Sequence, residues 1–105
     1  MLKTRVCEIF GIEYPILQGA MAWVSFAPLV AAVSNAGGLG IIGGTIFTPE
    51  QKRAEIRKVR ELTDKPFGVN IISLHPMIKQ VLEVLIEEKV LVATYGTGNP
   101  KKIIE

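Results

Sequence analysis

Residues 14–21 decide the fold of this sequence, and they are Tyr14-Pro15-Ile16-Leu17-Gln18-Gly19-Ala20-Met21. A short apolar run, typical of a buried strand, ends here in a polar amide and small residues. Pro15 suits the first residues of a strand, where a missing ladder donor is tolerated. Gln18 places an amide at the carboxyl end of that strand, and Gly19 lets backbone come close to whatever lies there. Ligands of parallel α/β proteins bind at this end, so residues 14–19 predict both the first strand and the edge of the sheet that carries a site.

Strand and helix patterns alternate through the rest of the chain. Further strands are predicted at residues 39–42, 67–72 and 90–95. Helices are predicted from an N-cap at Ser25 to the Gly37-Gly38 stop, over 48–64, over 76–88 and from 101 to 105. The alternation predicts right-handed βαβ crossovers and a parallel sheet of about four strands.

The helix predicted at 48–64 has the clearest boundaries. Thr48 suits the N-cap, Pro49 the first helical position, and Gln51 the third position of a capping box. Three apolar residues are expected to face the core: Ile56, Val59 and Leu62. The charges at 50–65 are expected to form a solvated face, as are those that end the next helix, Glu87-Glu88-Lys89.

Composition indicates one folded domain over residues 1–105, with 49% hydrophobic and 21% charged residues. The net charge of +2 and the interleaving of bases with acids argue against a nucleic-acid or membrane partner. No apolar run approaches the ~18–20 residues of a membrane span, and the first residues do not resemble a secretory signal. Cys7 is the only cysteine, so it is expected to be a buried apolar residue in a reducing compartment, the cytoplasm.

Residues 38–43 match the G-x-G-x-x-G dinucleotide fingerprint through Gly38, Gly40 and Gly43. The fingerprint binds a pyrophosphate only where it follows a strand and opens a helix. Here it follows a predicted helix and contains a predicted strand. The sequence therefore favours a structural role for these glycines: a helix stop, close helix–strand packing and a turn.

Four groups of residues together resemble one enzyme family in the correct order. They are Thr4-Arg5 with residues 11–16 and 18–24, then residues 31–40 (AAVSNAGGLG), residues 62–70 (LTDKPFGVN) and residues 96–100 (GTGNP). These motifs resemble the amino terminus of FMN-dependent nitronate monooxygenases, which the related FMN-dependent enoyl-acyl carrier protein reductases share. The resemblance implies the amino-terminal half of a TIM barrel, with flavin across the carboxyl ends of the strands.

Five residues carry the implied cofactor site. By the resemblance, Ala20, Met21 and Ala22 supply backbone contacts to the flavin ring, and Asn70 hydrogen-bonds the flavin or its phosphate-bearing tail. Gln18, at the end of the first predicted strand, completes the set. An uncharged amide can both donate and accept, which suits the alternating carbonyl and N–H edge of a flavin. Many relatives carry glycine at the position of Ala20, which leaves the conformation of this loop open.

The resemblance implies oxidation of alkyl nitronates by flavin and oxygen. Reduction of an enoyl thioester by NAD(P)H through FMN is the alternative, because the quoted motifs suit both branches. No catalytic residue is expected here, since the proton-abstracting histidine of nitronate monooxygenases belongs to the second half of the barrel. His75 is expected to be a helix cap or surface residue, and one histidine with one cysteine makes no metal site.

A full (β/α)8 barrel takes ~250 residues, so these 105 are expected to be a partial barrel that stops within its fourth βα unit. Such a piece leaves the edges of its sheet unpaired. It is expected to form a homodimer, to pair with a second half-barrel, or to be a non-catalytic remnant. The barrel interpretation predicts that Met21 and Asn70 are neighbours at one rim.

Overall fold

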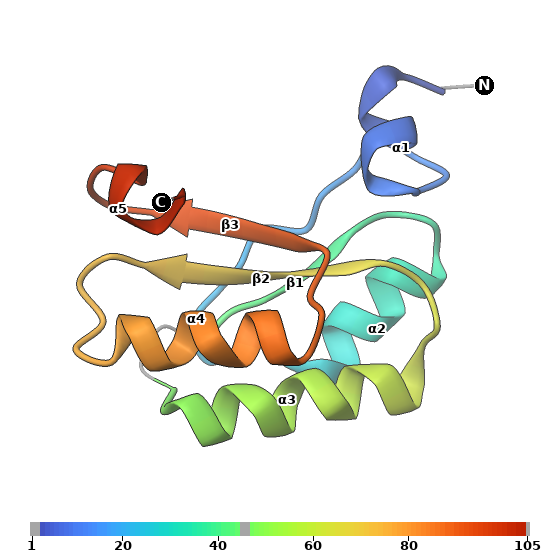
Figure 1. The fold of residues 1–105 in the computed structure, drawn as a ribbon. Coiled ribbons are helices and arrows are strands. Elements are labelled where there is room, and N and C mark those ends of the chain that lie inside the picture. The colour runs from blue at the N-terminus through green and yellow to red at the C-terminus, as the bar shows by residue number, and fades with distance from the viewer. Residues whose placement is uncertain (1–2, 45–46, 105) are drawn as a thin grey trace.

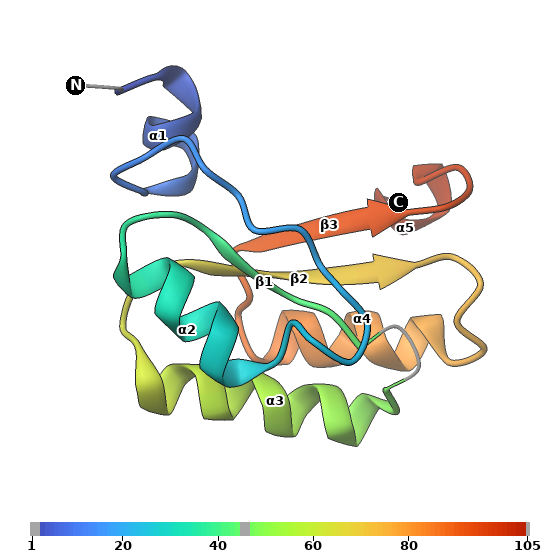
Figure 2. The same cartoon turned by 180° about the vertical axis from the view of Figure 1, so that it is seen from behind.

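The computed structural model describes residues 3–44 and 47–104, which alternate helices with parallel strands (Figure 1). The elements are α1 (Arg5–Phe10), α2 (Ala27–Asn35), β1 (Gly40–Ile42), α3 (Pro49–Leu62), β2 (Phe67–Ile72), α4 (Ile78–Glu87), β3 (Val92–Gly96) and α5 (Lys101–Ile104). The strands pair in the order β1-β2-β3, all parallel. Helices α2, α3 and α4 cover one face of the sheet, and α1 lies beyond the other, as the views from front and back agree (Figure 2). Sequential strand order with the crossover helices on one face is the arrangement of a barrel segment, as predicted.

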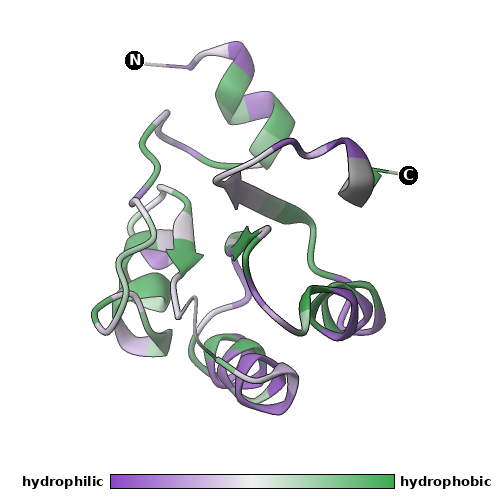
Figure 3. Ribbon diagram, turned by 90° about the vertical axis from the view of Figure 1, so that its left-hand side faces the viewer, coloured by the Kyte–Doolittle hydropathy of each residue, from purple (hydrophilic) through white to green (hydrophobic). Residues whose placement is uncertain are grey.

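The two faces of the sheet carry different cores. The face under the helices carries the larger one, in which Ile42, Val69 and Ile71 pack against apolar residues of α2, α3 and α4. On the opposite face, Ile41 packs with Cys7 and Ile12 in a small cluster. Figure 3 shows the apolar sides of the helices facing the sheet and their polar sides facing outward. The buried position predicted for Cys7 is confirmed, because its side chain is 5% exposed.

The first predicted strand is present only as a single bridge, in which Leu17 pairs with Leu39. Leu39 donates to the carbonyl of Ile16 (2.9 Å) and accepts from the N–H of Gln18 (3.0 Å). The pairing with β1 extends no further because a side chain, that of Gln18, takes its place. The Gln18 amide both accepts from the Ile41 N–H and donates to the Ile41 carbonyl, each at 3.3 Å. A side chain thus occupies the place of the next strand residue, and the prediction of a full strand at 14–19 was wrong.

The helix boundaries agree with those predicted from the sequence where the residues that set them are close neighbours in the chain. Thr48 and Gln51 form the predicted capping box at the start of α3. The prediction of Ser25 as N-cap of α2 was wrong, because the cap is Phe26 and the Ser25 side chain is buried in the loop before it. Leu62 was also predicted wrongly: it is 53% exposed, at the last turn of α3, where the helix has passed the edge of the core.

The charged face predicted for 50–65 is partly buried. Glu88, which follows α4, accepts hydrogen bonds from three arginines of α3 and is only 11% exposed: Arg53 at 2.8 Å, Arg57 at 3.1 Å and Arg60 at 3.3 Å. These bonds lower the pKa of the Glu88 carboxyl, that from Arg53 most strongly. The solvated helix end predicted at Glu88 is therefore a link between α3 and α4. Among the described residues, no helix is long and apolar enough to cross a lipid bilayer.

Candidate functional site

The carboxyl ends of the three strands meet at one rim, where the loops that follow them are tied together. His75, after β2, contacts the Phe47 carbonyl through Nε2 at 2.7 Å, which links this loop to the one after β1. Ser73 donates to the Thr97 carbonyl at 2.6 Å, which links it to the loop after β3. The Nδ1 atom of His75 accepts from the N–H of Met77, the N-cap of α4, as a predicted cap residue does. Because Nδ1 accepts, the neutral ring carries its proton on Nε2.

Residues 19–25 form a loop that is fixed at the same rim by the buried hydroxyl of Ser25. That hydroxyl accepts from the Met21 N–H at 2.8 Å and from the Gln18 amide at 2.7 Å, and donates to the Gly19 carbonyl at 3.2 Å. The Gln18 amide also contacts that carbonyl. The Gln18 side chain thus forms hydrogen bonds within the protein, and in this structure it positions the loop.

The loop lies directly against the end of β1. A Cβ atom on Gly43 would stand 2.6 Å from the Met21 carbonyl oxygen, so only glycine allows this approach. The glycines of the G-x-G-x-x-G match therefore serve close packing and turns, as predicted. The match opens no helix among the described residues, because residues 40–42 form β1.

Unused hydrogen-bond donors collect at this rim. The backbone N–H groups of Ala20 and Ala22 donate to no acceptor within residues 3–44 and 47–104. Asn70, near the end of β2, accepts from the Thr94 hydroxyl at 2.7 Å through Oδ1. Its Nδ2 amino group has no partner in the described part of the chain. Three donors without an internal acceptor are therefore available to a ligand.

Asn70 and Thr94 occupy paired positions on β2 and β3. They lie on the face of the sheet that the helices leave uncovered, because their neighbours Val69 and Ile71 point into the larger core. The hydroxyl of Thr94 therefore fixes the orientation of the Asn70 amide and turns its amino group away from β3.

Lys52 of α3 lies beneath this rim and was not predicted from the sequence as a site residue. Its side chain is 2% exposed, and its ammonium group donates to the carbonyls of Gly43 (3.0 Å), Gly44 (3.1 Å) and Asn70 (3.3 Å). Burial lowers the pKa of Lys52 to about 8. The expectation of a fully solvated face at 50–65 is thus wrong at Lys52. The signal was present, since Lys52 stands four residues before Ile56 and shares its inward face.

Lys52 also connects the two residues whose proximity the barrel reading requires. The Met21 backbone packs on Gly43, and the carbonyls of Gly43 and Asn70 accept from the same ammonium group. Met21 and Asn70 therefore belong to one rim. Met21 and Trp23, in the loop before α2, are exposed at 45% and 69%.

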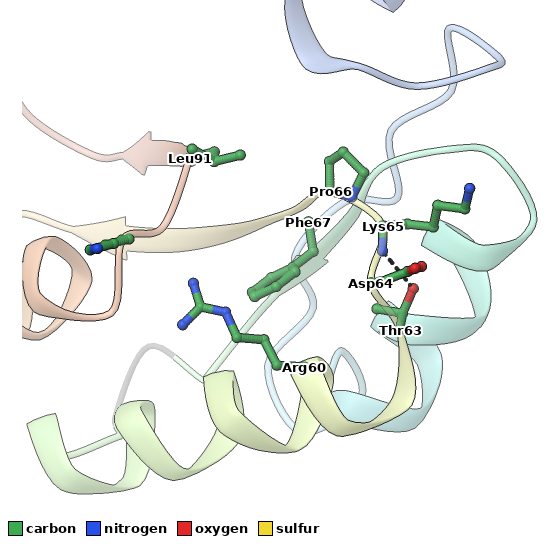
Figure 4. Close-up of a pocket in the computed structure, with 8 residues that line it drawn as sticks. Arg60, Thr63, Asp64, Lys65, Pro66, Phe67 and Leu91 are labelled. Atoms are coloured by element: carbon green, nitrogen blue, oxygen red, sulfur yellow. Dashed lines mark hydrogen bonds between the residues drawn. The ribbon is translucent and has the colours of Figure 1, made fainter.

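A hollow lies at the other end of the sheet, where β2 begins (Figure 4). It measures about 360 Å³, and Arg60 is one of its lining residues, with the guanidinium carbon 5.8 Å from the centre of the Phe67 ring. Figure 4 shows Lys65 and Asp64 at its border, on the segment that leads into β2. None of the rim residues lines this hollow.

Comparison with known proteins agrees with this geometry. Residues 3–103 match the family described as nitronate monooxygenase. The chain is 42% identical over 103 residues to "(3aS,4S,5R,7aS)-5-hydroxy-7a-methyl-1-oxo-octahydro-1H-indene-4-carboxyl-CoA dehydrogenase" of Mycobacterium tuberculosis, covering 98% of the chain and 29% of that enzyme. It is 49% identical over 69 residues to a probable nitronate monooxygenase of Staphylococcus aureus, covering 66% of the chain and 19% of that protein.

A solved structure, FabK from Thermotoga maritima, superimposes with a TM-score of 0.97 at 51% identity, covering 100% of this chain and 34% of FabK. The chain thus spans about a third or less of the length of these relatives. The match over residues 3–103 shows that this chain belongs to the nitronate monooxygenase family.

Proposed function

We propose that the rim binds FMN and forms part of the active site of a flavin-dependent oxidoreductase. The observation that supports it is the presence of donors without an internal acceptor at the carboxyl ends of parallel strands. The backbone N–H groups of Ala20 and Ala22 and the amino group of Asn70 are available there. A flavin ring presents carbonyl oxygens and ring nitrogens that accept such bonds, so the donor set fits this cofactor.

Each residue has a part in holding the cofactor. Ala20, Met21 and Ala22 supply backbone contacts from the loop that packs against the end of β1, and Asn70 supplies a side-chain donor from β2. Gln18 fixes the loop through Ile41 and Ser25, as described above. Bound FMN would supply the transfer of hydride or electrons, and none of the described residues is proposed as a catalytic acid or base.

The substrate we propose is a small nitronate, oxidised with oxygen, as the family resemblance implies. An enoyl thioester reduced by NAD(P)H is the second candidate. The observation that favours it is the 42% identity to an enzyme whose name specifies a carboxyl-CoA, which is also a thioester. Both reactions use the same flavin site, so the rim alone does not separate them.

The edge of the sheet supports a further part of this proposal, that more strands complete the barrel. β3 has no strand on its outer side within the described residues, and Leu91 just before it is 83% exposed. A second copy of the chain or another half-barrel segment would pair with this edge. Mass measurement in solution, with and without FMN, distinguishes a monomer from such an assembly.

The test of the cofactor is the absorbance of the purified protein between roughly 350 and 500 nm, followed by FMN titration. A flavin spectrum, or saturable FMN binding to a colourless preparation, supports the proposal. Absence of both overturns it and leaves a non-catalytic half-barrel. For a flavin-bearing form, oxygen uptake with a nitronate indicates the first reaction, and NADPH oxidation with an enoyl thioester indicates the second.

A further inference from the structure

Lys52 is a buried cation to which the proposed function assigns no role. Its ammonium group has three N–H donors, and three backbone carbonyls accept them. Two of these carbonyls belong to the Gly43–Gly44 turn after β1, and the third belongs to Asn70. The group therefore joins the end of β1, on which the Met21 backbone packs, to Asn70 of β2.

We propose that Lys52 is a positioning residue of the cofactor site, and that loss of its proton weakens flavin binding. The inference rests on the FMN site proposed above. A neutral amine has only two N–H donors, so one of the three carbonyls loses its partner when the proton leaves. The positive charge that attracts an anionic phosphate-bearing ligand is lost in the same step. Both effects weaken FMN binding.

The surroundings of Lys52 contain few other groups that titrate. The small cavity beside it, about 10 Å³, is lined by one other titratable side chain, His75, whose two ring nitrogens both have partners. On α3 itself, Glu55 accepts from the Ala27 N–H, and Glu50 lies 3.9 Å from Arg53. β1, β2 and α2 contribute no titratable side chain.

The remaining neighbour is α4, whose residues Ile78 and Val81 line that cavity. Its charged residues, Lys79, Glu83 and Glu87, are exposed. The aromatic ring of Phe47 lies 5.7 Å from the Lys52 ammonium. With a pKa of about 8, lowered by burial, Lys52 changes its charge within an accessible pH range.

The experiment measures FMN affinity by flavin fluorescence from about pH 7 to about pH 9.5, for the unaltered protein and for Lys52→Arg. Arginine stays charged throughout this range, so the variant also corrects for titration of FMN itself. We expect the affinity of the unaltered protein to fall about threefold or more relative to Lys52→Arg, which corresponds to roughly half a pKa unit of linkage. Parallel curves for the two proteins overturn the inference.

A second measurement needs no substitution. Linkage requires that FMN raise the proton affinity of Lys52 by the same factor by which the proton raises FMN affinity. The pKa of Lys52 therefore rises when FMN binds. NMR titration of the lysine ε-groups, with and without saturating FMN, measures this shift directly. An unchanged Lys52 titration in a protein that binds FMN overturns the inference alone. Failure to bind FMN at any pH overturns the proposed function, and the inference with it.

Discussion

The hydroxyl of Thr94 donates to the Oδ1 atom of Asn70 at 2.7 Å, from the paired position on the neighbouring strand. This bond determines which end of the Asn70 amide is left for a ligand. Without it, the amide is free to present either its oxygen or its amino group. The pair therefore decides whether the rim offers a donor or an acceptor at this position.

The first prediction tests that pair with Thr94→Val, which removes the hydroxyl and preserves the shape of the side chain. We expect a loss of about 0.5–1.5 kcal/mol in the free energy of unfolding, measured in urea, and weaker FMN binding. The matched partner is Asn70→Ala. If the two residues act as a unit, the double variant loses less FMN affinity than the sum of the single losses. Additive losses would show that Thr94 does not act through Asn70.

A second prediction concerns the start of α2, which lacks a side-chain cap of its own. The Glu55 carboxylate of α3 accepts from the Ala27 N–H at 2.8 Å and so acts as the cap of α2. Glu55→Ala is expected to lower the free energy of unfolding by about 1 kcal/mol, the usual effect of losing a cap. Glu61→Ala, an exposed position on the same helix, is the control and is expected to change stability by less than about 0.5 kcal/mol. Equal effects of the two variants would contradict the capping role.

The third prediction uses the lowered pKa of Glu88. A carboxyl whose pKa is lower in the folded protein stabilises it above the unfolded value, near 4.5, and this stabilisation is lost as the pH falls through the folded value. We expect Glu88→Gln to lower the urea midpoint at neutral pH and to match the unaltered protein once the pH is well below 4.5. Glu87→Gln, which removes a partner of Arg53 alone, is expected to have the smaller effect. A pH-independent difference would show that the charge of Glu88 is not what matters.

A fourth prediction separates the stability of the protein from its cofactor affinity. The pKa of Lys52 falls from 10.5 to about 8 on folding, so the unfolded chain binds this proton more tightly. The free energy of unfolding should therefore rise between these two pH values, by up to about 3 kcal/mol relative to Lys52→Arg. FMN affinity is expected to fall over the same range. Stability that does not rise with pH relative to Lys52→Arg would contradict the buried position of this charge.

Local signals allowed much of the fold to be predicted. The Thr48–Gln51 capping box and the strand at 67–72 each depend on neighbouring residues, and both were confirmed. The failures depend on distant residues. The Gln18 amide replaces a stretch of strand because it reaches Ile41, and Glu88 is only 11% exposed because α3 brings arginines to it. No spacing within either segment carries that information.

The candidate site divides in the same way. The motifs placed Ala20, Met21, Ala22 and Asn70, whose contacts with a flavin remain a prediction, and the structure puts them at one rim. The residues that hold the rim together could be identified only from the fold: Ser25 bonds to Met21, Thr94 to Asn70 and His75 to Phe47, which are 4, 24 and 28 positions away. Lys52 is the intermediate case, since its helical spacing from Ile56 indicated burial but its charge suggested a solvated position.

The most direct measurement of the central claim is an NMR titration of the ¹⁵N-labelled protein with FMN. Backbone amides of Ala20 and Ala22 and the side-chain amide of Asn70 are expected to show the largest shifts. Amides of Thr63 and Lys65, at the hollow on the opposite end of the sheet, serve as the internal control and are expected to stay in place. Shifts confined to that hollow, or none at any FMN concentration, would contradict a flavin site at the carboxyl ends of the strands.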